Sequence, residues 1–138
     1  MKILVVVDPA SPTHRDVDLA VKVALRESAR IDLFACDDEP GVPQDWVGSI
    51  NVREYRGILR ERTLQRLEEI ARPIRTQGLV VTTACLWHAS RAEGIYRHIL
   101  QSDADLLAYG GSLIAYAESH SIMQKRASEP PSEQTLRD

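Results

Sequence analysis

Residues Thr82 to Gly111 read TTACLWHASRAEGIYRHILQSDADLLAYGG, and this stretch decides the fold. It begins with β-branched and apolar residues typical of a strand. Ser90 then precedes Glu93 by three positions, which is the capping-box pattern of a helix start, with the serine as the cap. The apolar run 106–109 follows that helix and ends at two glycines. Strand, helix and strand in this order predict two parallel strands joined by a right-handed crossover.

The chain before this stretch repeats the same alternation. Ile3 to Val7 are apolar without polar alternation, as in a strand buried on both faces, and Asp8-Pro9 ends that run. The further elements we expect are a helix capped by Ser11 or Thr13, a strand at 31–35, a helix at 54–77 that ends at Gly78, and a strand at 79–87. The fold class is therefore α/β, a parallel open sheet with helices on both faces.

The carboxyl-terminal residues are expected to contribute less to the fold. Residues 112–126 have a weak apolar side and predict one more helix, whereas 127–138 have the composition of a disordered tail. We therefore expect one domain at 1–126 and a tail at 127–138. The segment 40–53 has no periodicity and is expected to be a long loop.

Composition excludes several classes of protein. The 138 residues are 43% hydrophobic and 27% charged, which is ordinary for a globular domain. A net charge of −3 does not favour a nucleic-acid partner, and no apolar run reaches the roughly 20 residues of a membrane span. The run Ile3 to Val7 is shorter than a signal-peptide core of about 7–15 residues, so a cytoplasmic location is expected.

Candidate ligand-binding residues follow the strands. Parallel open sheets bind ligands beyond the carboxyl ends of their strands, near the point where the strand order reverses. The candidates at the four expected strand ends are Asp8, Pro9, Asp37, Trp87, His88, Gly110, Gly111 and Ser112.

Each candidate also has a purely structural interpretation. Asp8 can cap the loop that follows it, Trp87 can be a partly buried strand-end residue, and Gly110-Gly111 can be a plain turn. Cys36 and Cys85 lie in apolar runs and are expected to be buried thiols. Their spacing matches no zinc signature, so no metal site is expected, and no nucleophile motif or Walker loop indicates a catalytic residue.

The opening MKILVVVD, the run ADLLAYGG and the order of elements between them resemble the universal stress protein family. Leu86-Trp87-His88 look more like its tandem-domain branch than its short ATP-binding branch. The resemblance implies an adenine-nucleotide alpha-hydrolase-like sheet of strand order 3-2-1-4, a role in stress response, and a homodimer. It also implies an adenine nucleotide as ligand, ATP or AMP with magnesium, with Asp8 near the adenosine end.

The sequence departs from the family after Gly111. The ATP-binding branch carries a glycine, two residues, a glycine, nine residues, and a glycine before Ser or Thr. Leu113 or Ile114 stands at the second glycine position, and no glycine occurs later. Backbone N–H groups of such loops approach phosphates, so we expect only weak nucleotide binding. The family's fifth strand is also expected to be missing, with a degenerate or truncated carboxyl end.

Three functions remain open at this point. The first is a ligand-binding regulatory module without catalytic turnover. The second is a scaffold that binds a partner protein, or a second copy, through an exposed sheet edge. The third is an adenylate-handling enzyme of the same fold group, which would need a phosphate loop.

Overall fold

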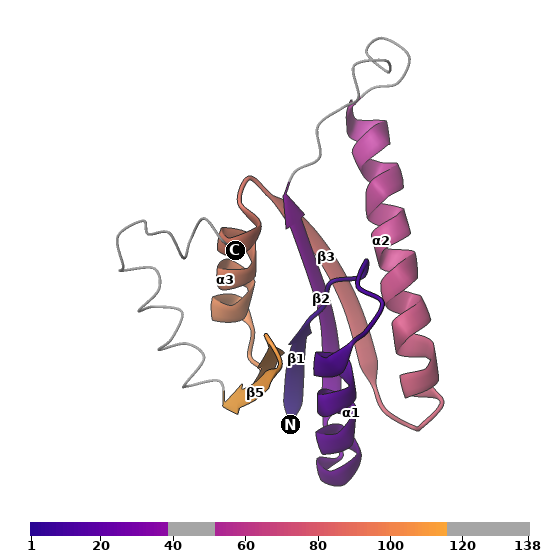
Figure 1. The fold of residues 1–138 in the computed structure, drawn as a ribbon, viewed down its shortest axis with the longest axis vertical. Helices are drawn as coiled ribbons and strands as arrows, with labels where there is room; N and C mark the ends of the chain where they lie inside the picture. The colour runs from indigo at the N-terminus through magenta and orange to yellow at the C-terminus, as the bar shows by residue number, and fades with distance from the viewer. Residues whose placement is uncertain (39–51, 116–138) are drawn as a thin grey trace.

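The computed structural model describes residues 1–38 and 52–115 (Figure 1). These residues form β1 (Lys2–Val6), α1 (Arg15–Glu27), β2 (Arg30–Asp38), α2 (Val52–Arg75), β3 (Val81–His88), α3 (Arg91–Gln101), β4 (Leu106–Tyr109) and β5 (Ser112–Ala115). The predicted alternation of strands and helices is confirmed from β1 to β4. The expected loop at 40–53 lies outside the described residues except for 52 and 53, which begin α2. The expected tail at 127–138 lies outside them entirely.

The strands form one sheet of order β3-β2-β1-β4-β5. β1 pairs in parallel with β2 on one side and with β4 on the other, and β2 pairs in parallel with β3. The predicted order 3-2-1-4 is confirmed. The strand order reverses between β1 and β4, so their carboxyl ends mark the switch point of the sheet.

The expectation that no fifth strand follows β4 is wrong. β5 pairs antiparallel with β4, and Gly110 and Gly111 form the two-residue turn between them, with φ angles of 63° and 83°. Positive φ at both turn residues is the condition for the tight hairpins that match strand twist, and glycine meets it without strain. Residues 112–115 are therefore strand and not the start of the expected helix, whose remaining residues 116–126 lie outside the described part.

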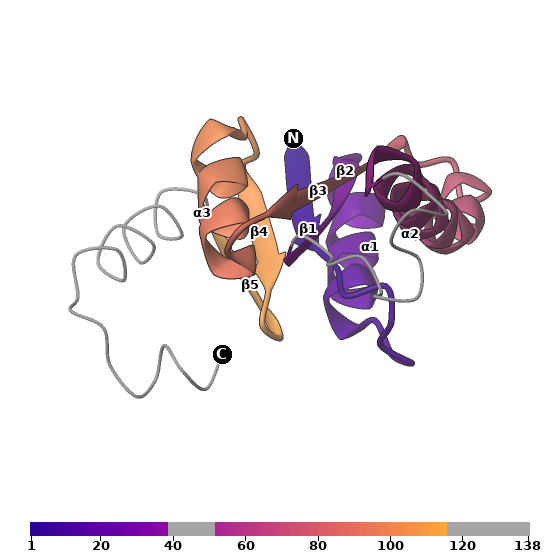
Figure 2. The ribbon, with the colours of Figure 1, turned by 90° about the horizontal axis from the view of Figure 1, so that it is seen from above.

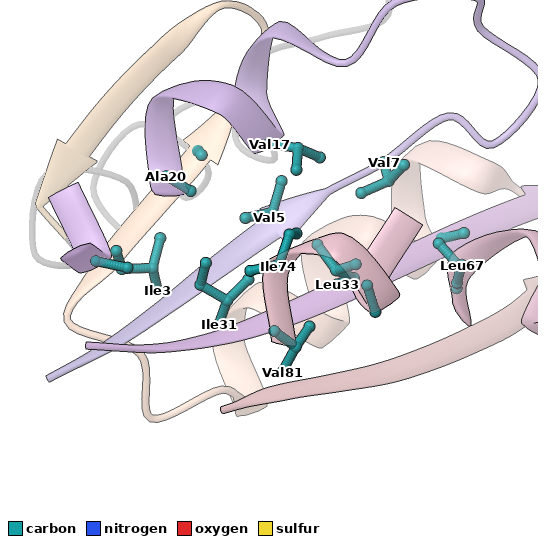
Figure 3. Packing of buried hydrophobic residues seen from close by; sticks show 14 of the residues in the cluster. Ile3, Val5, Val7, Val17, Ala20, Ile31, Leu33, Leu67, Ile74 and Val81 are labelled. Carbon is teal, nitrogen blue, oxygen red and sulfur yellow. The ribbon is translucent and has the colours of Figure 1, made fainter. Parts of the chain in front are cut away.

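Helices cover the two faces of the sheet unequally. α1 and α2 lie on one face and α3 on the other (Figure 2). Side chains of β1 and of Val7 directly after it alternate between the two layers. Ile3, Val5 and Val7 belong to the cluster under α1 and α2 (Figure 3), and Leu4 and Val6 to the cluster under α3. β1 is thus the central buried strand that its unbroken apolar run predicts.

The amino terminus of α3 bears out half of its predicted capping box. Ser90 Oγ accepts a hydrogen bond from Glu93 N at 3.4 Å. Glu93 does not complete the box, because Ser90 N donates instead to His88 Nδ1 at 3.1 Å and Glu93 Oε1 pairs with Arg97. The expectation that Ser11 or Thr13 caps α1 is wrong, because His14 is the N-cap of this helix and makes no side-chain cap bond.

α3 rests on β2 through a histidine and a phenylalanine. The rings of His98 and Phe34 stack with centroids 3.7 Å apart and planes 2° apart. Burial at this contact lowers the pKa of His98, because a charged imidazolium would lose its hydration there.

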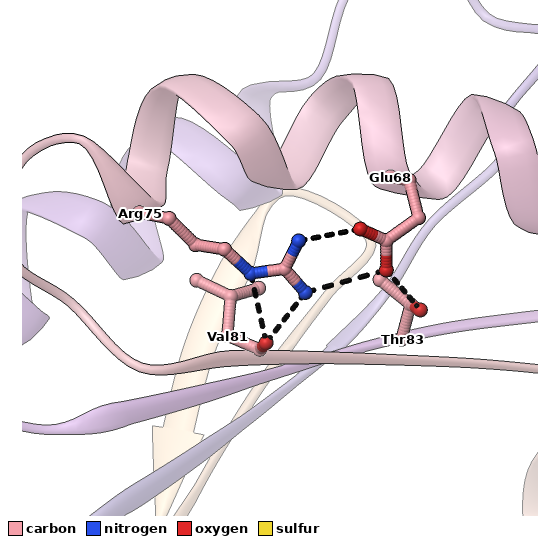
Figure 4. Close-up of polar contacts among 4 residues, drawn as sticks. All are labelled: Glu68, Arg75, Val81 and Thr83. Carbon is pink, nitrogen blue, oxygen red and sulfur yellow. Dashed lines mark hydrogen bonds and ion pairs between the residues drawn. The ribbon is translucent and has the colours of Figure 1, made fainter.

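α2 is joined to the edge strand β3 by a polar cluster (Figure 4). The Arg75 guanidinium pairs with the Glu68 carboxylate and donates to the Val81 carbonyl oxygen, with Nη2 to O at 2.8 Å. Thr83 Oγ1 donates to Glu68 Oε1 at 2.8 Å. The hydrogen bond from Arg75 holds the pKa of Glu68 below its ordinary value, and Thr83 contributes in the same direction.

No helix within the described residues is both long and apolar enough to cross a membrane.

Candidate functional site

A pocket of about 210 Å³ lies at the carboxyl ends of β1 and β4. Its walls come from the end of β1, the loop into α1, the first turn of that helix, the start of α3 and the end of β4. The lining residues are Val6, Val7, Asp8, Ser11, Thr13, His14, Arg15, Asp16, Val17, Arg91, Tyr109 and Gly110. This is the switch point of the sheet, where open parallel sheets bind their ligands.

Asp8 holds the loop that follows β1. Its Oδ1 accepts a hydrogen bond from Ala10 N at 3.0 Å, and its carbonyl oxygen accepts one from Ser11 N at 3.1 Å. Ser11 Oγ in turn donates to Thr13 O at 2.8 Å. The carboxylate is exposed and still lines the pocket, so capping the loop leaves it within reach of a ligand.

A second carboxylate enters the pocket from α1. Asp16 lies in the first turn of this helix, where the helix dipole favours a negative charge. Its Oδ1 accepts a hydrogen bond from Gly111 N at 2.8 Å. The backbone donor of the β4–β5 turn is therefore already bonded to a side chain of the chain itself.

The charges that line the pocket are balanced. Its lining includes two acidic residues, Asp8 and Asp16, and two arginines, Arg15 and Arg91. Arg91 lies at the start of α3, and its Nε donates to the Cys36 carbonyl oxygen at 2.9 Å. The pocket therefore offers carboxylate acceptors and guanidinium donors, the groups that bind hydroxyls and amides, without an excess of positive charge.

The structure brings together only part of the predicted set. Asp8 and Gly110 line the pocket, whereas Pro9, Gly111 and Ser112 are their chain neighbours. Gly110-Gly111 form the plain turn that was the alternative interpretation. A ligand-binding role of these residues stays a prediction.

Asp37, Trp87 and His88 do not line this pocket. In the register of the sheet Val6 pairs with Phe34, so Asp37 lies three residues, or about 10 Å, beyond the end of β1. Asp37 pairs with Trp87 at the far end of β2 and β3. These residues lie beyond the pocket because β2 and β3 are longer than β1, and their role in ligand binding stays a prediction.

Trp87 lines a second pocket instead, of about 200 Å³, between α2 and β3. Its other lining residues are Arg56, Arg60, Cys85 and Leu86. Burial raises the pKa of the Cys85 thiol, because a thiolate would lose its hydration there. Both cysteines are buried, as expected, and the described residues contain no cluster of three or more His, Cys, Asp or Glu arranged to hold a metal ion.

Several pocket residues were not among the sequence candidates. Ser11, Thr13 and His14 could have been included, because they follow Asp8 along the chain and precede α1. Asp16 carries no such signal, since its partner Gly111 is 95 positions away and the contact exists only in the folded chain. Arg91 also comes after a strand end, but the sequence pattern around it indicates only the first residue of a helix.

Comparison with solved structures shows the same fold in universal stress proteins. A protein of this family from Burkholderia pseudomallei is 18% identical, with a TM-score of 0.59, over 94% of this chain and 91% of that one. A universal stress protein from Archaeoglobus fulgidus is 15% identical, with a TM-score of 0.50, over 94% and 95% of the two chains. Another from the same organism, in complex with dAMP, is 17% identical over 88% and 90%, with a TM-score of 0.48.

No protein-family model matches the chain, and no curated protein sequence matches it. The structural class is nevertheless clear: the chain has the universal stress protein fold, as the resemblance in the sequence predicted. At these identities the likeness establishes the fold of the chain.

Proposed function

We propose that the chain is a universal stress protein-type ligand-binding module, which acts in the stress response by holding an adenine nucleoside or nucleotide without turning it over. One observation carries this proposal: the pocket at the β1–β4 switch point is lined by Asp8 at the end of β1. A carboxylate there can accept hydrogen bonds from ribose hydroxyls or from an exocyclic amine.

The size of the pocket limits what it can enclose. Pockets for drug-sized ligands measure about 300–1,000 Å³, and this one measures about 210 Å³. It therefore suits one moiety of a nucleotide, with the remainder exposed to solvent. Partial enclosure buries less apolar surface, so we expect affinities in the micromolar range or weaker.

Isothermal titration with adenosine, and with AMP and ATP in the presence of magnesium, tests the proposal. Asp8→Asn keeps an acceptor for Ala10 N but removes the charge, and hydrogen bonds to charged groups contribute about 1.5–3 kcal/mol. We therefore expect at least about a tenfold loss of affinity. Asp37→Asn is the matched control, because this carboxylate also lies near the carboxyl end of a strand but does not line the pocket. Equal losses in both variants, or no heat at about 100 μM protein, would refute the proposal.

A partner-binding scaffold, including a homodimer, is the second candidate function. Its support is the exposure of two large apolar side chains at the edge of the sheet, Val80 at 56% just before β3 and Leu86 at 44% near the end of that strand. Unpaired strand edges with apolar side chains favour association. Light scattering of the purified protein, with Leu86→Lys as the variant, tests the homodimer. A monomeric wild type at about 100 μM would refute it, because even a weak dimer would be populated at that concentration.

A further inference from the structure

Asp16 occupies the place in the pocket where an anionic ligand would find backbone donors. Helix N-termini and turns of positive-φ residues both favour anions, because their N–H groups converge without partners from the main chain. Here the first turn of α1 and the Gly110-Gly111 turn border the same pocket. The Asp16 carboxylate lies between them and accepts the Gly111 N–H at 2.8 Å.

A phosphate group entering this place would have two obstacles. It would have to displace Asp16 from Gly111 N, and it would then lie next to a second negative charge. The phosphate and the Asp16 carboxylate would repel each other more strongly in a partly desolvated site than in water. The two guanidinium groups of the pocket do not offset this, because Asp8 and Asp16 balance them.

An uncharged nucleoside meets neither obstacle. Its hydroxyl groups donate to carboxylates, and they can do so while Asp16 keeps its bond to Gly111. The same arrangement that disfavours a phosphate is therefore compatible with ribose.

We propose that Asp16 is a specificity-determining residue that makes the β1–β4 pocket select nucleosides over nucleoside polyphosphates. This inference rests on the proposed function, since it concerns the ligand of the same pocket. It predicts that the wild-type protein binds adenosine at least tenfold more tightly than ATP. It also assigns this preference to one charge in the first turn of α1.

The test compares adenosine and ATP on the wild-type protein and on Asp16→Asn by isothermal titration. Asparagine keeps an oxygen acceptor for Gly111 N and removes the charge, so the turn stays in place. We expect the ratio of ATP affinity to adenosine affinity to rise at least tenfold in Asp16→Asn. Asp18→Asn is the matched control, because Asp18 is the other acidic residue of that first turn and does not line the pocket.

A second readout separates this inference from the proposed function. Inorganic pyrophosphate is titrated into the ¹⁵N-labelled protein while the Gly110 and Gly111 amide signals are followed. We expect no saturable shift in the wild type or in Asp18→Asn, and a saturable shift in Asp16→Asn. If this is observed while adenosine binds to no variant, the proposed function fails and only the exclusion of phosphate groups by Asp16 stands.

The inference is overturned if the ratio of ATP to adenosine affinity is the same in the wild type and Asp16→Asn. It is also overturned if the wild type binds ATP more tightly than adenosine. If either result is obtained and Asp8→Asn weakens adenosine binding, the proposed function stands and the inference about Asp16 fails. If no nucleotide binds and pyrophosphate does not shift the Asp16→Asn signals, both fail.

Discussion

Gly94 is the residue at which α3 comes closest to the sheet. A Cβ atom at this position would lie 2.6 Å from Cys36 Sγ and 2.9 Å from His88 Cβ. Both atoms belong to strands with little freedom to move, so a side chain here must displace the helix. The absence of a side chain at Gly94 thus sets the distance between α3 and the ends of β2 and β3.

We therefore expect Gly94→Ala to destabilise the fold, although alanine favours helices. Overpacking of a filled site typically costs about 1–3 kcal/mol, which exceeds the gain of about 0.5–1 kcal/mol from helix propensity. Gly57→Ala is the control, because Gly57 lies within α2 and a Cβ there meets nothing within 4 Å. Urea unfolding should give a lower midpoint for Gly94→Ala and an equal or higher one for Gly57→Ala. Equal midpoints for the two variants would contradict the packing argument.

At the scale of elements, the contact between α2 and β3 protects a sheet edge. Ile31 N donates to Val80 O on the β2 side, so the Val81 carbonyl points to the opposite side of β3. Arg75 covers that carbonyl with Nε and Nη2 while Glu68 holds the guanidinium in place (Figure 4). A helix side chain thus bonds an edge carbonyl that could otherwise pair with another chain.

A double-mutant cycle of Arg75→Lys and Glu68→Gln should reveal this coupling. Both side chains are about 40% exposed, so we expect a coupling free energy of about 0.5–1 kcal/mol at pH 7. The folded-state pKa of Glu68 is lowered below its ordinary value of 4.5, so its stabilising contribution is present above that value. It should be lost as pH falls through the lower folded-state pKa. Urea unfolding at a series of pH values measures this, with Arg66→Lys on the same helix as the control. A coupling that stays constant in acid would contradict the assignment.

At the scale of the whole molecule, the free energy of local opening should decrease from β1 toward β5. All five residues from Ile3 to Val7 are at most 5% exposed, and β1 is paired on both sides. β5 is four residues long, paired with β4 and exposed at both ends, Ser112 and Ala115. Strands that are short and solvent-exposed open locally at lower free energy than the core does.

Amide hydrogen exchange followed by NMR tests this difference between β1 and β5. We expect the amides of β1 to exchange at least about 100-fold more slowly than those of β5, because β1 requires nearly global unfolding to open. Amides of the central strand β2 should resemble β1. Exchange of β1 at the rate of β5 would show that the sheet opens as one unit and would contradict the argument.

The sequence by itself determined the elements, and its resemblance to universal stress proteins implied the order of the parallel strands. The apolar run Ile3 to Val7 and the Ser90 cap are local patterns, and right-handed crossovers between such elements allow few arrangements. Even β5 had a local signal in Gly110-Gly111, a pair typical of hairpin turns. It was outweighed by the apolar spacing that continued into residues 116–126.

Only the tertiary structure decided which residues share the candidate site. Trp87 and His88 end a strand, and Asp8 closely follows one, yet strand length and register place Trp87 about 10 Å beyond the end of β1 and His88 one residue further. Asp16 meets Gly111 across 95 positions, a contact that depends on how α1 packs beside β4. Periodicity and capping act over a few neighbouring residues, whereas the composition of a pocket depends on the packing of whole elements. For this reason the fold could be predicted from the sequence and the charge balance of its pocket could not.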